Sequence, residues 1–164
     1  MIGEILAHTP VWVFVLFLAL VAIGLSQVRT RNLSPARLFA LPVAMVGFSL
    51  YGFLSAFGAN AFAAAAWLAG LLGMGALIAA ARFPRGVTYS DRSFRLPGSW
   101  VPFFVIMAIF FSRYVITVAL TMTPALRGLA AVAAGVGAIY GLSSGFFVGR
   151  TLTALRAMRA PAPA

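Results

Sequence analysis

Five long stretches of this sequence contain no lysine, aspartate or glutamate. They run over about residues 10–28, 38–57, 61–81, 100–122 and 126–148. An α-helix needs about 20 predominantly apolar residues to cross a bilayer, and each stretch is about that long. Only 9% of the residues are charged, whereas a soluble domain has about 25% charged residues. The sequence therefore predicts an all-α membrane protein, a bundle of five transmembrane helices in one domain over residues 1–159, with a disordered tail over 160–164.

The basic residues predict how this bundle lies in the membrane. All twelve are arginine, and ten of them fall on one side of the predicted spans. These ten are Arg29, Arg31, Arg37, Arg82, Arg85, Arg92, Arg95, Arg150, Arg156 and Arg159. Because arginine-rich loops stay in the cytoplasm, we expect the N-terminus outside and the C-terminus inside (N-out/C-in).

The arginine clusters also indicate what kind of partner the protein binds. A net charge of +10 would suit nucleic acid, but the arginines lie between apolar runs, which is a membrane-surface pattern. We therefore expect membrane lipids, and not nucleic acid, as partners. The candidates for anionic lipid head groups lie in the first and third loops: Arg29, Arg31, Arg37, Arg82, Arg85, Arg92 and Arg95.

The third loop also has a strand-like pattern. Two short β-prone runs, 86–89 and 93–96, flank the polar residues 90–92. This pattern predicts a small cytoplasmic β-hairpin between the third and fourth helices. An isolated hairpin is only marginally stable, so we expect the helices or the lipid surface to support it.

A single arginine lies well inside a predicted span. Arg113 follows Trp100 by thirteen residues, which is roughly 20 Å along a helix. A charge at this depth costs from about 2.5 to over 10 kcal/mol and usually faces protein or water. Thr117 and Thr121 follow at four-residue spacing, with Tyr114 beside them.

Two interpretations of this polar stripe stay open. In the first, Arg113, Tyr114, Thr117 and Thr121 line a pocket or a water-filled crevice, where Arg113 anchors an anionic group or forms an ion pair. In the second, Arg113 packs against carbonyl and hydroxyl groups of neighbouring helices. The threonines would then donate to carbonyl groups of their own helix.

Few residues are available to pair with Arg113 or to bind a metal. Asp91 is expected on the cytoplasmic side, whereas Glu4 is on the outer side and is an ion-pair candidate for Arg113 or Arg127. His8 is the sole histidine and cysteine is absent, and metal sites generally need more than one strong protein ligand. We therefore predict no metal site and no cofactor.

The fifth stretch carries small residues at four-residue spacing: Ala133, Gly137, Gly141, Gly145 and Gly149. Small residues on one helix face allow two helices to approach closely in lipid. The pattern predicts a tight helix–helix contact, made either with another span of this chain or with a second copy in a homo-oligomer.

No catalytic motif is recognised, because the sequence lacks a P-loop, a dinucleotide fingerprint, a zinc-protease motif and an intramembrane carboxylate pair. The leading hypothesis is a non-enzymatic accessory or small-ligand-binding membrane component. The alternatives are a small-solute transporter or channel subunit using a crevice around Arg113, and a structural subunit of a larger membrane complex.

Four segments carry a resemblance to a family. They are residues 5–13 (ILAHTPVWV), 24–27 (GLSQ), 96–102 (LPGSWVP) and 110–114 (FFSRY). Together they resemble an uncharacterised bacterial family of small polytopic membrane proteins with a domain-of-unknown-function label, loosely similar to CcdC-type proteins. The resemblance implies a bacterial inner-membrane location. It brings no activity and no catalytic residues.

Overall fold

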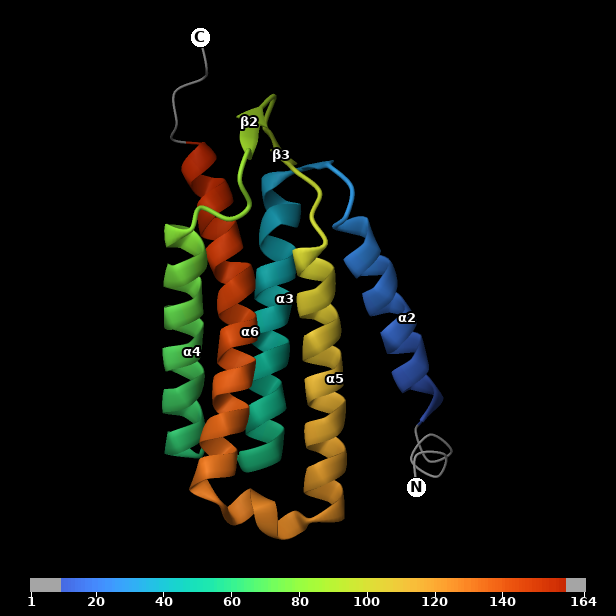
Figure 1. Ribbon diagram of the computed structural model, residues 1–164, viewed down its shortest axis with the longest axis vertical. Helices are drawn as coiled ribbons and strands as arrows, with labels where there is room; N and C mark the ends of the chain where they lie inside the picture. Colours follow the sequence, from blue (N-terminus) through green and yellow to red (C-terminus); the bar gives the residue numbers. More distant parts are fainter. Residues whose placement is uncertain (1–9, 159–164) are drawn as a thin grey trace.

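The computed structural model describes residues 10–158, which form an elongated helical bundle (Figure 1). Its α-helices are α2 (Val11–Ser26), α3 (Pro35–Phe57), α4 (Ala61–Ala80), α5 (Val101–Met122) and α6 (Ala130–Ala157). The helices α3, α4, α5 and α6 are long and apolar enough to cross a membrane. Helix α2 is an apolar helix of 16 residues, which is about 24 Å of helix, and it is inclined outward at the edge of the bundle (Figure 1).

The last helix differs most from its predicted boundaries of 126–148. A 3₁₀ helix, η1 (Pro124–Gly128), occupies the predicted start, so that α6 begins at Ala130. At the other end α6 continues to Ala157, because Arg150 is buried within the protein and does not mark the end of the helix. Helix α3 starts earlier than its predicted boundary at residue 38. Pro35 occupies its first turn, a position that proline favours.

The third loop forms the predicted hairpin. Strands β2 (Thr88–Ser90) and β3 (Ser93–Leu96) pair antiparallel, with Ser90 opposite Ser93. The two residues between them, Asp91 and Arg92, have φ values of 49° and 57°. Two consecutive positive φ angles are the mark of a tight type I′ hairpin turn, whose twist matches that of the strands.

A third strand, which the sequence did not predict, completes a small sheet. Strand β1 (Arg31–Leu33) follows α2 and pairs antiparallel with β3, giving the order β1–β3–β2. The buried side chains of Phe94 and Leu96 pack on Leu38 of α3 and Ala154 of α6. The sheet therefore rests on one end of the bundle (Figure 1), and this packing supports the hairpin.

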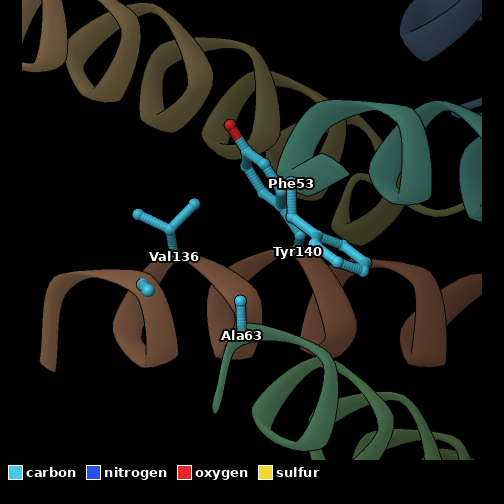
Figure 2. Packing of buried hydrophobic residues seen from close by; sticks show 5 residues of the cluster. Phe53, Ala63, Val136 and Tyr140 are labelled. Atoms are coloured by element: carbon cyan, nitrogen blue, oxygen red, sulfur yellow. The ribbon is translucent and has the colours of Figure 1, made fainter. Parts of the chain in front are cut away.

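Helices α4 and α6 make the closest pair in the described part of the chain. A methyl group built on any of four α6 glycines would lie 2.0–2.5 Å from a carbonyl oxygen of α4. These are Gly137, Gly141, Gly145 and Gly149. One turn earlier, Ala133 is fully buried in a cluster with Ala63 of α4, and Figure 2 shows Ala63 against α6. The glycine face of α6 is thus occupied by α4 of the same chain.

Hydrogen bonds tie a third helix to this pair. The hydroxyl groups of Ser49 in α3 and Ser144 in α6 are 2.6 Å apart. The indole N–H of Trp67 in α4 donates to the Ser49 hydroxyl at 3.0 Å. Phe53 of α3 lies beside Tyr140 of α6 in the same cluster (Figure 2). Helices α3, α4 and α6 therefore form a packed unit, with α5 and α2 beside it.

Candidate functional site

A large cavity lies between α2, α3 and α5 and has a volume of about 880 Å³. All four residues of the predicted polar stripe line it: Arg113, Tyr114, Thr117 and Thr121. Most of the other lining side chains are apolar, among them Trp12 and Leu16 of α2. A mostly apolar cavity with a few polar groups is typical of a small-molecule site.

Arg113 is held against α3 on one wall of this cavity. Its Nη1 donates to the carbonyl oxygen of Phe48 at 3.0 Å. The guanidinium carbon lies 4.1 Å from the centre of the Phe48 ring and 5.3 Å from that of Tyr140, distances suited to cation–π attraction. Gly52 makes room, since a methyl group built there would lie 2.9 Å from Nη1 of Arg113.

The other members of the stripe lie along the same face of α5. The hydroxyl of Thr121 donates to the backbone oxygen of Thr117 at 2.8 Å, as polar side chains in spans commonly do. The ring of Tyr114 stacks on that of Phe110, with 6.5 Å between the ring centres. The structure thus combines features of both interpretations, because Arg113 bonds a neighbouring carbonyl group and also borders a cavity.

The charge of Arg113 is not balanced by a carboxylate within residues 10–158. Asp91 is the sole acidic residue in that range, and it lies in the hairpin turn at the sheet end of the bundle (Figure 1). Arg113 lies about 18 Å along α5 from the start of that helix at the same end. Glu4, its proposed ion-pair partner, and His8 lie outside the described residues.

Comparison with known proteins places the chain in a family. A model of a family of unknown function (DUF6622) matches residues 1–164. The chain belongs to this family. The match confirms the predicted resemblance to a family with a domain-of-unknown-function label, while the likeness to CcdC-type proteins stays a prediction. No curated protein and no solved structure matches the chain.

The DUF6622 chain has a second cavity at its sheet end. Among the seven arginines predicted to face lipid head groups, Arg31 and Arg37 line it. Arg31 is half-buried, and the other six are exposed. Two further lining residues, Gln27 and Arg150, were missed, because Gln27 lies at the end of the first predicted span and Arg150 lies just beyond the fifth. Gln27 belongs to the GLSQ segment that carried the predicted family resemblance, which was the available signal.

Packed side chains separate the two cavities of this DUF6622 chain. The two share no lining residue. One hydrophobic cluster contributes to both, with Leu41 and Phe147 at the sheet-end cavity and Met45 and Ile106 at the larger one. Ile106 and Phe147 are each 2% exposed. The larger cavity therefore does not continue past Arg113 to the sheet end.

Proposed function

We propose that this DUF6622 protein is a non-enzymatic, multi-pass protein of the bacterial inner membrane. It binds an amphipathic, lipid-like ligand in the groove formed by α2, α3 and α5. The apolar chain of the ligand packs along the groove, and a polar acceptor group receives an N–H of Arg113. The N-terminus lies outside, and α2 is the fifth span.

The distribution of charge supports this orientation. The sheet, the loops with Arg29 and Arg82 and the end of α6 lie at one end of the bundle, whereas Arg127 in η1 lies at the other (Figure 1). By the positive-inside rule, the sheet end is cytoplasmic. Helix α2 is short for a span, but short helices are accommodated by local thinning of the bilayer at modest cost.

Single cysteines test this topology, because the natural chain has none. We expect Ala125→Cys in η1 and Val11→Cys in α2 to react with an impermeant maleimide added outside spheroplasts. Ser90→Cys in the hairpin should react only after permeabilisation. All three positions are exposed. Labelling of Val11→Cys on the same side as Ser90→Cys would show that α2 does not cross the membrane.

The single observation that supports the proposed ligand is the position of Arg113. Its guanidinium forms part of the wall of a large, mostly apolar cavity, and no carboxylate within residues 10–158 is near enough to balance it. A charge inside a bilayer usually marks a binding or transport site. Arg113 donates one hydrogen bond to the backbone of α3. A guanidinium has five N–H donors, so the group can also donate to a ligand.

The separation of the two cavities favours binding over transport. A transporter or channel subunit needs a path from one side to the other, and the cluster around Ile106 and Phe147 interrupts it. A path opening past Met45 during activity would support the transport alternative. Loss of the protein from membranes lacking a partner protein would support a structural subunit.

Removal of the charge of Arg113 tests the proposed function. We expect Arg113→Met to retain about tenfold less of the co-purified ligand, since a hydrogen bond to a charged group contributes about 1.5–3 kcal/mol. Thr117→Trp, which fills the groove from its exposed wall, should have the same effect. Native mass spectrometry after extraction in mild detergent measures the retained mass.

Arg127→Met is the matched control, because Arg127 is exposed in η1 and lines neither cavity. This variant should retain the ligand of the unmodified protein. Equal retention by Arg113→Met, Thr117→Trp and the unmodified protein would overturn the proposed groove.

A further inference from the structure

The cavity at the sheet end is walled by three arginines. It measures about 420 Å³ and lies between the end of α2, β1, the start of α3 and α6. Arg31 comes from β1, Arg37 from α3 and Arg150 from α6. No carboxylate lines this cavity within residues 10–158. Three distant parts of the chain therefore bring positive charge to one place without a matching negative charge.

Arg150 is the most deeply buried of the three. Only 5% of its surface is exposed. Its Nη1 donates to Oε1 of Gln27 at 3.1 Å, whereas its Nε is buried without a hydrogen-bond partner among the described residues. Nη2 of Arg31 donates to the same Oε1 atom, and Gln27 itself is 2% exposed. Nη1 of Arg31 also donates to the hydroxyl of Ser26 at 3.3 Å. The two guanidinium groups thus share one neutral amide oxygen.

This arrangement is incomplete in both hydrogen bonds and charge. An amide oxygen has two lone pairs, and the two arginines use both, so Gln27 Oε1 cannot also satisfy Nε of Arg150. The two positive charges also repel each other. Burial lowers the pKa of Arg31, but an arginine still carries its proton at neutral pH. A buried charge without a partner costs several kcal/mol, and an anion from outside the chain would offset that cost.

We propose that this cavity binds a phosphate group. The planar guanidinium donates paired hydrogen bonds that match phosphate oxygens, and a phosphate offers acceptors to several arginines together. Basic pockets between spans on the cytoplasmic side suit phospholipid head groups. Ile23, Leu41 and Phe147 form an apolar part of the same wall, where an acyl chain can pack. This site does not depend on the groove around Arg113.

The test compares arginines inside and outside the cavity. Arg37→Gln is the test variant, because Arg37 is exposed at the rim and its replacement should leave the fold intact. Arg29→Gln is the matched control, since Arg29 is an exposed arginine in the connection before β1 and does not line the cavity. Arg31→Gln is a second test variant, which removes one of the two donors to Gln27.

Two measurements separate the sources of the phosphate. In the first, protein extracted from nanodiscs of equal phosphatidylcholine and phosphatidylglycerol is analysed by native mass spectrometry for the lipid that it retains. In the second, lipid-stripped protein in a neutral detergent is melted with and without inorganic phosphate. We expect preferential retention of phosphatidylglycerol and a decrease of about tenfold in both Arg37→Gln and Arg31→Gln, with no decrease in Arg29→Gln.

Each outcome decides the proposal. Retention of phosphatidylglycerol without stabilisation by inorganic phosphate assigns the site to a lipid head group, and stabilisation by inorganic phosphate assigns it to a soluble phosphate. Arg113→Met should leave the stabilisation by inorganic phosphate and the effect of Arg37→Gln unchanged, so the groove can fail without affecting this site. The proposal is wrong if neither form binds, or if Arg29→Gln weakens binding as much as Arg37→Gln, because the attraction would then be that of a diffuse basic surface.

Discussion

Replacement of Gly141 by alanine is expected to destabilise the bundle by about 2–3 kcal/mol, the upper part of the range for an overpacked core. The added methyl group would lie 2.0 Å from the carbonyl oxygen of Trp67 and 2.8 Å from its carbonyl carbon. Both atoms belong to the backbone of α4, so a side-chain rotation cannot relieve the clash. The two helices must separate, and the contacts along the whole glycine face weaken with them.

Gly135→Ala is the control for this prediction. Gly135 lies on the same helix, six residues before Gly141, and a methyl group there meets nothing within 4 Å. Alanine is favoured over glycine in a helix by about 1 kcal/mol, so this variant should be neutral or stabilised. Unfolding in mixed micelles with increasing dodecyl sulfate, followed by circular dichroism, measures both variants. Equal midpoints for the two variants would contradict the close packing of α4 and α6.

Local patterns in the sequence predict much of the helical bundle and the hairpin. The hairpin follows from a polar turn between two β-prone runs. Strand β1 was not predicted, because Arg31, Asn32 and Leu33 have little strand character and are extended through pairing with a strand more than sixty residues later. Similarly, the glycine spacing of α6 predicts a close contact, but it does not say that α4 is the partner.

The candidate site, too, could be predicted from the sequence only in part. Arg113, Thr117 and Thr121 share a face of α5 because of their four-residue spacing, and this spacing is visible in the sequence. The groups that face Arg113, the carbonyl of Phe48 and the space at Gly52, come from another helix. They depend on how α3 and α5 pack, which no pattern within one helix reports.

Arg150 is the clearest failure of prediction from sequence. An arginine after an apolar run usually marks the end of a span, and the predicted fifth span therefore stopped at residue 148. In the structure Gln27, which is 123 residues away, accepts a hydrogen bond from Arg150 and allows it to be buried inside α6. A hydropathy pattern cannot anticipate a polar partner so distant in the chain.

The crossing of two loops at Gly98 gives the second large expected effect. Gly98→Ala should destabilise the sheet end by about 2–3 kcal/mol, because its methyl group would lie 1.9 Å from the carbonyl oxygen of Val28. Beside it, the N–H of Ser99 donates to the backbone oxygen of Gln27 at 2.9 Å, and Arg31 pairs with Leu96. Separation of the two loops would therefore weaken β1–β3 pairing and displace Gln27.

This effect should stay local, and the location of the change distinguishes it from that of Gly141→Ala. Hydrogen exchange is expected to speed up over residues 28–33 and 94–99 in Gly98→Ala, and to stay slow in α4 and α6, because the nearest atoms to the added methyl group belong to Val28 and Arg29. Gly128→Ala, at the end of η1 with nothing within 4 Å of the added methyl group, should match the unmodified protein. If the rates of hydrogen exchange in Gly98→Ala matched those in Gly128→Ala, the two loops would not be in contact at Gly98. The position of Gln27 between Arg31 and Arg150 would then lack the support that fixes it.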